Sequence, residues 1–364
     1  MLEAPLYPVS RVHLDVLTDE IGIHQHAIGS VPDPDHGYCV DDVARALQVD
    51  LLHGRELGWD AIATSAWRSL RFLEDAFDAP SGRFRNFRRV DGAWLDGPAS
   101  EDSQGRAMLA LGEAVSTAGD AQMSERASLL FTRALPAAQG VAAIRAQSSV
   151  LLGCQAALAM LEDGPTTLAH GLIAHEVRTA FDRAAGSDWP WPEARVTYEN
   201  ALPVHALLRA GIHLELPALV QTGLDMLDWL IGAQTAPAGH FSPVGNTWWR
   251  ARGTKPQFDQ QPIEATAILL ASETAYRHTL DIKYRSAMER AYAWFLGRND
   301  LGVDLADPGR GASFDGLTPT GVNLNQGAES TLMWSMALEH IRELRRNGDA
   351  LPRDRGAMAM SLTR

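Results

Sequence analysis

The sequence has few of the features that would assign it to a class at once. It contains only two cysteines, Cys39 and Cys154, which excludes a disulfide framework and a cysteine-built metal centre and predicts a reducing compartment. No uncharged apolar stretch is long enough to cross a bilayer. The first residues lack a basic segment followed by an apolar one, so we expect no signal peptide. These absences predict a cytoplasmic protein without a membrane partner.

Positive charge is also scarce. The chain has 32 Lys and Arg against 45 Asp and Glu, a formal net charge of −13. Such a field repels phosphate backbones, so we expect no nucleic-acid partner. Glycine-rich phosphate loops and the nucleophile elbow of serine hydrolases are missing, and no cofactor is expected. The histidines of HQHAIGSVPDPDH (24–36) could bind a metal, but without a matching carboxylate pattern we predict no metal site.

Helical periodicity, in contrast, runs along nearly the whole sequence. Two kinds of helix alternate, six of each. One kind is apolar almost all round and must be buried on most sides, whereas the other is amphipathic. The apolar helices are expected at 41–53, 105–118, 148–161, 199–212, 263–276 and 328–341, and the amphipathic ones at 8–18, 60–77, 123–135, 166–184, 217–233 and 281–296.

Six buried helices inside six amphipathic ones are typical of an (α/α)6 barrel, a ring of helical hairpins. We therefore predict an all-α fold in which residues 1–364 form one domain. Links into the buried helices are mostly long and links out of them are short, so the long loops should gather on one rim. Long structured loops usually carry function. The long loops are 19–40, 78–101, 185–198, 234–261 and 297–326.

Acidic residues stand at the predicted starts of five buried helices. A single acid there can complement the helix dipole, worth about 0.3–1 kcal/mol, and capping is the better explanation for any one of them. Five clusters on one rim would repel one another and raise some pKa values, which capping does not require. We therefore predict a functional site that contains Asp41, Asp42, Glu101, Asp102, Glu199, Asp259, Glu264 and Glu329.

The loops of the same rim add aromatic, amide and basic side chains. Flat rings bind the apolar faces of sugars, while carboxylates, amides and guanidinium groups bind hydroxyls. Alternatively, tryptophans anchor loops on the barrel, as we expect of one or two of the four. Acids, rings and amides at the mouth of one barrel predict a carbohydrate substrate. Beside the acids, the predicted binding residues are His26, His36, Arg45, Trp189, Trp191, Asn200, Trp248, Trp249, Gln260, Gln261 and Asn325.

Carbohydrate chemistry suggests roles for the acids. Inverting glycoside hydrolysis needs one carboxylic acid to protonate the leaving oxygen and another carboxylate to activate water, about 6.5–9.5 Å apart. Starts of different helices can provide that separation, whereas neighbours in sequence cannot. The expected catalytic partners are Asp259 or Glu264 on one side and Asp42 or Asp102 on the other, with Asp41, Glu101, Glu199 and Glu329 binding substrate.

Three segments carry a resemblance to known proteins: HAIGSVPDPDHGYCVDDVARAL (26–47), NTWWRARGTKPQFDQQPIEA (246–265) and VNLNQGAESTLMW (322–334). The chain as a whole resembles the six-hairpin glycosidase superfamily. The three segments resemble an uncharacterised bacterial group, whose members occur alone or fused behind glycosyltransferases, often near mannoside phosphorylases. The resemblance implies the same barrel, a place in carbohydrate metabolism, and a glycosyltransferase or phosphorylase in the same pathway.

The acids and the resemblance together favour an inverting glycoside hydrolase that acts on a small or oligomeric glycoside. One alternative is a sugar epimerase, isomerase or phosphorylase of the same barrel type. The epimerases of the superfamily use a histidine pair on inner helices, and the pair that this sequence offers there is His205 and His340. The other alternative is a non-catalytic carbohydrate-binding partner of a glycosyltransferase.

Overall fold

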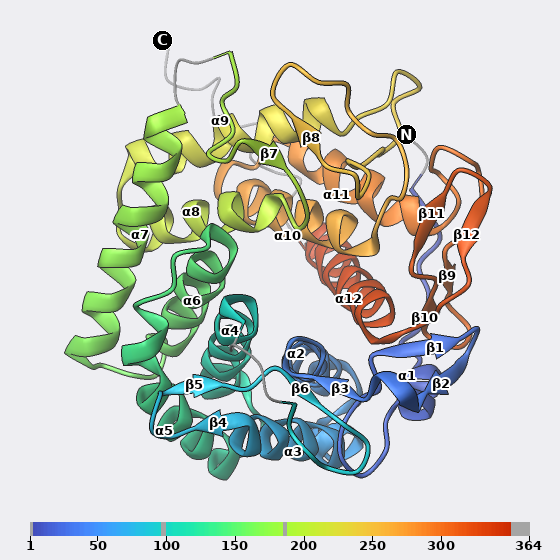
Figure 1. Ribbon diagram of the computed structural model, residues 1–364. Helices are drawn as coiled ribbons and strands as arrows, with labels where there is room; N and C mark the ends of the chain where they lie inside the picture. The colour runs from blue at the N-terminus through green and yellow to red at the C-terminus, as the bar shows by residue number, and fades with distance from the viewer. Residues whose placement is uncertain (1–2, 96–99, 185–187, 351–364) are drawn as a thin grey trace.

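The structure, a computed structural model, describes residues 3–95, 100–184 and 188–350. In these ranges, twelve helices alternate along the chain between an inner and an outer ring (Figure 1). The inner helices are α2 (Val40–Leu57), α4 (Glu101–Thr117), α6 (Ile144–Ala157), α8 (Ala201–His213), α10 (Pro262–Thr279) and α12 (Ala328–Ala350). The outer helices are α1 (Val12–Leu17), α3 (Trp59–Ala76), α5 (Ala121–Ala138), α7 (Gly164–Ala184), α9 (Pro217–Ala233) and α11 (Ile282–Phe295).

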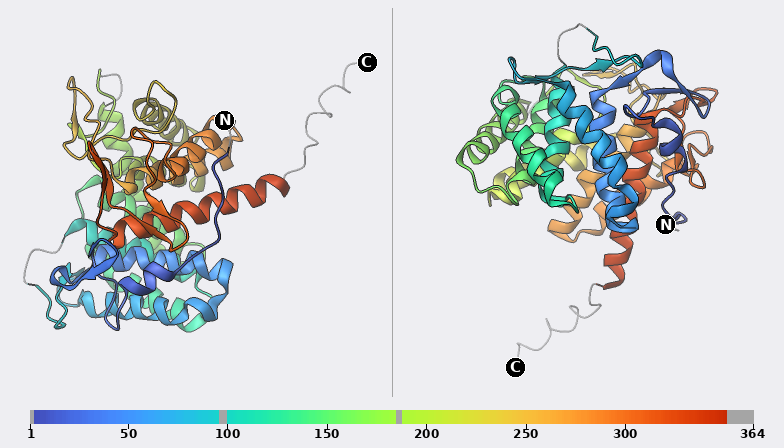
Figure 2. Two further views of the ribbon diagram at one scale, coloured as in Figure 1. Left: turned by 90° about the vertical axis from the view of Figure 1, so that its right-hand side faces the viewer. Right: turned by 90° about the horizontal axis from the view of Figure 1, so that it is seen from below.

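The inner helices close a ring in chain order, since each contacts the next and α12 returns to α2. The predicted (α/α)6 barrel is therefore confirmed. The last inner helix, α12, extends beyond the end of the barrel that lies opposite the strand pairs (Figure 2). The helix expected at 8–18 covers only Val12–Leu17, and no side chain caps its first turn. Within the described ranges, no helix is both long and apolar enough to cross a membrane.

Small residues let the inner helices approach one another closely. Between α4 and α6, a Cβ atom added to Gly112 would lie 2.1 Å from the carbonyl oxygen of Gly153. A Cβ added to Gly153 would lie 2.4 Å from the carbonyl oxygen of Met108. Only glycine fits at these two positions, because a backbone atom cannot move aside as a flexible side chain can. The apolar, small-residue composition of the inner helices thus reflects contact on nearly every side.

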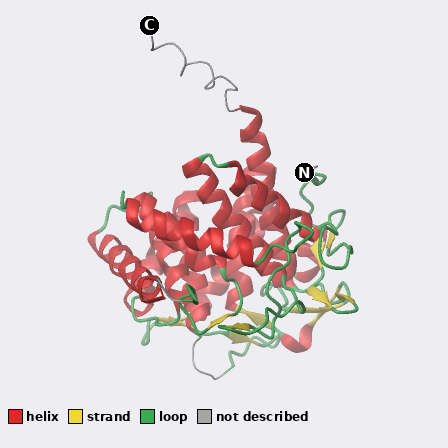
Figure 3. Ribbon diagram, turned by 90° about the horizontal axis from the view of Figure 1, so that it is seen from above, coloured by secondary structure: helices red, strands yellow, loops and turns green. Residues whose placement is uncertain are grey.

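Short antiparallel strand pairs reinforce the long loops, and they gather at one end of the barrel (Figure 3). Two of these pairs join different loops, which ties the rim together; a bridge between Gln260 and Leu317 adds a third link. The pairs within the described residues are β1 (His26–Ile28) with β2 (Val31–Asp33), β3 (Tyr38–Cys39) with β6 (Phe87–Arg88), β4 (Phe77–Asp78) with β5 (Arg83–Phe84), β7 (Arg195–Val196) with β8 (Trp249–Arg250), β9 (Ala306–Asp307) with β10 (Ala312–Ser313), and β11 (Gly316–Thr318) with β12 (Gly321–Asn323).

The close approach of α4 and α6 predicts the effect of one methyl group. Gly112→Ala should lower the free energy of unfolding by about 1–3 kcal/mol, because the two helices must separate to admit the new Cβ. Gly171→Ala on the outer helix α7 is the matched control, since nothing lies within 4 Å of its added Cβ. That change should stabilise the protein by roughly 0.5–1 kcal/mol. Thermal unfolding of both variants checks the prediction, and equal shifts would contradict it.

Candidate functional site

Two buried arginines form the centre of the long-loop rim. Arg45 lies in the second turn of α2 and Arg106 in the second turn of α4. Arg45 Nη1 donates to Asp42 Oδ1 at 2.9 Å, and its Nη2 lies 2.9 Å from Glu329 Oε2 in the first turn of α12. A buried guanidinium needs such partners, because the cost of removing an unpaired charge from water is high.

The second arginine draws in two more acids. Arg106 Nη2 donates to Glu199 Oε2 at 2.5 Å and its Nη1 donates to Glu199 Oε1 at 3.3 Å, so the contact is bidentate. The Nε atom of Arg106 lies 3.7 Å from Asp41 Oδ2. Four acids, Asp41, Asp42, Glu199 and Glu329, thus surround two arginines, and the group carries an excess of carboxylates.

Glu199 occupies an unusual backbone conformation just before α8. Its φ is +46°, in the left-handed region that a side chain other than glycine rarely adopts. The inner helix was expected to begin at this residue, but α8 begins two residues later, at Ala201. Arg106 holds the carboxylate in the resulting turn. Strained residues of this kind persist when their surroundings fix them, and they concentrate at functional sites.

Asp41 is the acid of this group with the least complete set of partners. Its side chain is 24% exposed, yet its Oδ1 atom is buried and has no hydrogen-bond partner among the described residues. Burial raises the pKa of Asp41 to about 6, although Arg106 and Arg45 oppose the shift. The neighbouring Asp42 has a raised pKa for the same reason, but it is bound by Arg45 and by the thiol of Cys39.

A second polar network joins α4, α6, α8 and α10 on the same rim. The hydroxyl of Tyr198 donates to Asp102, and Arg145 Nη2 donates to Asn200 Oδ1 at 3.2 Å. Asn200 in turn donates from Nδ2 to Glu264 Oε2 at 2.9 Å. Glu264 is only 2% exposed, and burial raises its pKa to about 7 despite the hydrogen bonds from Asn200. The structure therefore brings two of the four predicted catalytic acids, Asp102 and Glu264, into one network.

Two other predicted acids lie differently. Glu101 Oε2 accepts hydrogen bonds from the backbone N–H groups of Ala142 and Ala143, at 3.0 and 2.7 Å, and so satisfies the start of α6. The capping alternative concerned the first turn of the helix that carries each acid, and in α4 that cap is provided by Ser100. Asp259 is exposed in the loop before α10. Its backbone carbonyl accepts a hydrogen bond from the backbone of Asn246, and within the described residues its side chain makes no hydrogen bond or ion pair with the arginines.

The histidine segment contacts the loop before α12. Asn325 Oδ1 accepts a hydrogen bond from the backbone of Ala27 at 2.8 Å, and Asn325 Nδ2 lies 3.2 Å from His26 Nδ1. The rings of His26 and His36 meet edge to face, 4.6 Å apart. Asp315 is close by, and burial together with Glu329 raises its pKa. No group of His, Cys, Asp and Glu among the described residues has the arrangement of a metal site.

Most of the predicted aromatic residues pack on the outer helix α9. The ring of Trp249 stacks on Trp229 with an interplanar angle of 3°, and Trp191 stacks on the same ring at 18°. Trp189 meets Trp229 edge to face, and Trp191 is fully buried. Trp248 differs, since it is 41% exposed and has the guanidinium of Arg195 5.4 Å from its ring centroid. Loop anchoring thus accounts for three of the four rings.

The two predicted glutamines before α10 also differ. Gln260 is fully buried; its Oε1 accepts from Trp294 Nε1 at 2.9 Å and its Nε2 donates to Gln257 and Asp300. Both polar atoms of its side-chain amide are therefore bound to other protein groups. Gln261 stands at the N-cap position of α10, and its side chain makes no capping hydrogen bond there.

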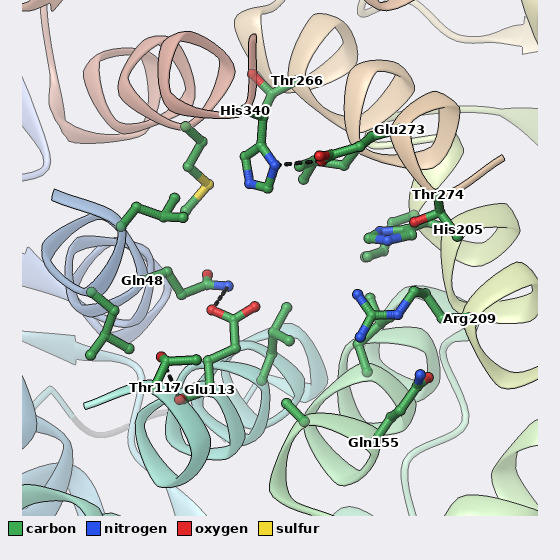
Figure 4. A pocket seen from close by; sticks show the side chains of 18 of the residues that line it. Gln48, Glu113, Thr117, Gln155, His205, Arg209, Thr266, Glu273, Thr274 and His340 are labelled. Atoms are coloured by element: carbon green, nitrogen blue, oxygen red, sulfur yellow. Dashed lines mark hydrogen bonds and ion pairs between the residues drawn. The ribbon is translucent and has the colours of Figure 1, made fainter. Parts of the chain in front are cut away.

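On the side of the arginines that faces away from the long loops lies a cavity that the sequence did not predict. It occupies about 560 Å³ of the barrel lumen and is bounded by Arg45, Arg106 and Glu199 at one end. Figure 4 shows the polar side chains that point into it. These residues come from all six inner helices and share no local motif, so only the folded ring reveals their grouping. They include Gln48, Glu113, Thr117, Gln155, His205, Arg209, Thr266, Glu273, Thr274 and His340.

Known structures share this architecture. The chain is similar to cellobiose 2-epimerase from Spirochaeta thermophila, with a TM-score of 0.69, 15% identity, and coverage of 92% of this chain and 93% of that one. A D-mannose isomerase gives a TM-score of 0.69, 12% identity and coverage of 92% and 95%. A GH76 α-mannanase from Bacteroides thetaiotaomicron gives a TM-score of 0.62 and 12% identity, with coverage of 93% of this chain and 95% of that one. At these identities the likeness establishes the (α/α)6-barrel fold. The sequence matches no family model and no curated protein.

The raised pKa of Glu264 predicts a dependence of stability on pH. An acid whose pKa rises from 4.5 to about 7 on folding holds its proton more tightly in the folded state. The free energy of unfolding therefore falls as the pH rises between about 4.5 and 7. Glu264→Gln removes the titrating group and therefore this loss. Between pH 4.5 and 8, the free energy of unfolding of the variant should rise by roughly 3 kcal/mol relative to that of the wild type. Chemical denaturation measures this gain, and a difference that stays constant with pH would contradict the assignment.

Proposed function

We propose that the protein is a carbohydrate-active enzyme, and that the rim formed by the long loops is its active site. The observation that carries the proposal is the setting of Asp41, a partly exposed acid beside a buried arginine in a ring of carboxylates. Carboxylates and guanidinium groups recognise hydroxyls, and an acid that keeps its proton near neutrality can protonate a leaving oxygen. The shared barrel fold of the epimerase, isomerase and mannanase supports this class of substrate.

Glycoside hydrolysis is the reaction that these side chains suit best. Asp41, with a pKa of about 6, serves as the proton donor. Glu329, at the start of a different helix, has a side chain that is 36% exposed and serves as the base that activates water. Arg45 and Arg106 orient the two acids and bind substrate hydroxyls. A donor and a base on opposite faces of the sugar invert the anomeric centre.

This assignment changes the roles that the sequence suggested. Asp42 is bound on both sides, and Glu264 is almost completely buried, so we assign them to positioning the rim. Asp102 and Asn200 hold the loop before α8. Among the aromatic residues, Trp248 alone is retained as a sugar-binding ring. His26, His36 and Asn325 border the site from the β1–β2 side.

A sugar epimerase is the second candidate, because His205 and His340 line one cavity. Burial lowers the pKa of His205 to about 3, whereas Glu273 raises the pKa of His340. A neutral and a protonated imidazole can exchange protons with a sugar carbon. Product analysis separates the two candidates, since hydrolysis releases a reducing end and epimerisation conserves chain length. The cytoplasmic location and the pathway with a glycosyltransferase or phosphorylase belong to the same proposal.

The role of Asp41 can be tested with one change. Reducing-end release from manno- and gluco-oligosaccharides, with and without phosphate, identifies the substrate. On it, Asp41→Asn should lower turnover by roughly 10²–10⁴-fold with little loss of stability, because an amide cannot donate the proton. Since the donor must be protonated, kcat/KM of the wild type should fall as the pH rises above about 6.

The matched control is Asp182→Asn, the same change on the outer helix α7, which should leave turnover unaffected. Full activity in Asp41→Asn, with loss of activity in Asp259→Asn, would return the donor role to the exposed loop acid. Full activity in both variants would contradict a rim carboxylic acid as the proton donor.

The two adjacent tryptophans give a further contrast. Trp248→Ala should weaken binding of the same oligosaccharide with an almost unchanged melting temperature, because its ring is exposed. Trp249→Ala removes a ring stacked on Trp229 and should cost on the order of 2–3 kcal/mol. Titration calorimetry and thermal unfolding measure the two effects. A stability loss in Trp248→Ala with unchanged affinity would make that ring an anchor as well.

A further inference from the structure

The lumen cavity lies on the opposite side of the two arginines from the long-loop rim. Its inner boundary is Arg45, Arg106 and Glu199, whose ion pairs close the lumen at that level. Its outer boundary is formed by the last turns of inner helices, where Arg55 and His213 are exposed. The cavity therefore opens at the short-loop end. Figure 1 looks onto the long-loop end, and the inner helices follow one another clockwise from α2 to α12. In Figure 4 they follow one another counterclockwise, so Figure 4 looks into the cavity from the short-loop end.

One charged side chain, that of Arg209, points into this cavity without a partner of its own (Figure 4). Arg209 makes no hydrogen bond or ion pair within the described residues; burial lowers its pKa, while Glu113 and Glu273 act on it only at longer range. Gln155 Oε1 also has no hydrogen-bond partner among the described residues, but it is closed off from the cavity. The guanidinium of Arg209 is therefore the unpaired group that a ligand in the cavity can reach. A ligand that accepts hydrogen bonds from it would supply the missing partner.

Other groups in the cavity are half satisfied, with one edge bound and the other free. Glu113 Oε2 accepts from Gln48 Nε2 at 3.0 Å, which leaves its second oxygen for a ligand. His340 Nδ1 lies 2.5 Å from Glu273 Oε2, which fixes the ring and leaves Nε2 toward the cavity (Figure 4). These contacts fix the directions of the remaining donor and acceptor atoms before any ligand binds.

The charges of the lining favour a neutral ligand. Five arginines and three histidines are interleaved with Glu113, Glu199, Glu273 and Glu343, so neither sign dominates strongly. The carbonyl ends of the inner helices also point toward this mouth, and their dipoles disfavour an anion. Closely spaced donors and acceptors suit hydroxyl groups, which donate and accept at once. A volume of about 560 Å³ lies within the range of small-ligand sites.

We infer that this cavity is a second ligand site, entered from the short-loop end, that binds a neutral polyhydroxylated molecule of mono- or disaccharide size. Arg209 from α8 and Glu113 from α4, the two inner helices on either side of α6, bind its hydroxyls, while the leucines and methionines of the wall contact its carbon skeleton. The inference does not depend on the reaction proposed for the rim. A sugar held here would touch the inner side of Arg45 and Arg106, and so could influence the rim acids that those arginines hold.

The test uses the full chain with D-mannose, D-glucose, cellobiose and β-1,4-mannobiose as probes. Saturation-transfer NMR and titration calorimetry should detect binding of at least one of them. Arg209→Met, which keeps the length of the side chain, should weaken that binding at least tenfold. Ala156→Leu, which fills part of the lumen from α6, should do the same without changing any charge. Asp41→Asn should keep the binding, although it lowers the turnover proposed for the rim.

The matched control is Arg183→Met on the outer surface of α7, which removes the same charge and should bind the probe as wild type does. The melting temperature of Arg209→Met should not fall, because its guanidinium has no partner to lose. Three results would overturn the inference: no probe binds, binding is equal in all variants, or Asp41→Asn loses binding while Arg209→Met and Ala156→Leu keep it. Failure of the rim reaction leaves each of these outcomes unchanged.

Discussion

The buried pair of arginines on α2 and α4 is the interaction on which the rest of the site depends. A guanidinium in a barrel lumen is tolerated only when carboxylates accompany it. The carboxylates that pair with Arg45 come from the starts of α2 and α12, and the one that pairs with Arg106 comes from the turn before α8. The acids at the helix starts are therefore required by the arginines as well as by the helix dipoles. Because carboxylates outnumber arginines, one acid is left incompletely paired, and that acid is Asp41.

The direction of the inner helices gives the two ends of the lumen different chemistry. At the long-loop end, six helix N-termini favour negative charge, and the acids gather there. At the other end, helix C-termini favour cations, which is consistent with Arg55 and Arg277 in the last turns of α2 and α10. The ion pairs of Arg45 and Arg106 lie between the two ends. One barrel thus offers an acidic face bordered by structured loops and a mixed, partly apolar chamber behind it.

Much of the fold could be predicted from the sequence, because helical periodicity is a local signal that repeats. The alternation of apolar and amphipathic helices predicted the ring, and the loop lengths predicted that the long loops gather on one rim. Helix starts were less accurate: α4 begins four residues earlier than expected and α8 two residues later, which leaves Glu199 in a turn. Such boundaries depend on tertiary contacts, here the bond from Glu199 to Arg106, that no local pattern contains.

The acids of the candidate site were predicted as a group, but the contact that each side chain makes was not. The sequence identified the acids as a group, yet it could not show that Glu101 caps α6 or that Asp259 faces solvent, since both depend on side-chain direction. The tryptophan segments suggested sugar recognition, but Trp229, the ring on which they pack, lies on an outer helix distant in sequence. The cavity was invisible because Arg209, Glu113 and His340 each sit singly on a different helix.

The central claim is that one rim aspartate keeps its proton close to neutral pH because the effect of burial on its pKa outweighs that of the arginines beside it. Carbon-13 NMR of protein labelled at the aspartate carboxyl carbon measures this directly. The account predicts that the carboxyl resonance that disappears in Asp41→Asn titrates in the wild type with a pKa of about 6. A spectrum in which the resonance lost in that variant titrates near the ordinary value of an aspartic acid, about 3.9, would contradict it.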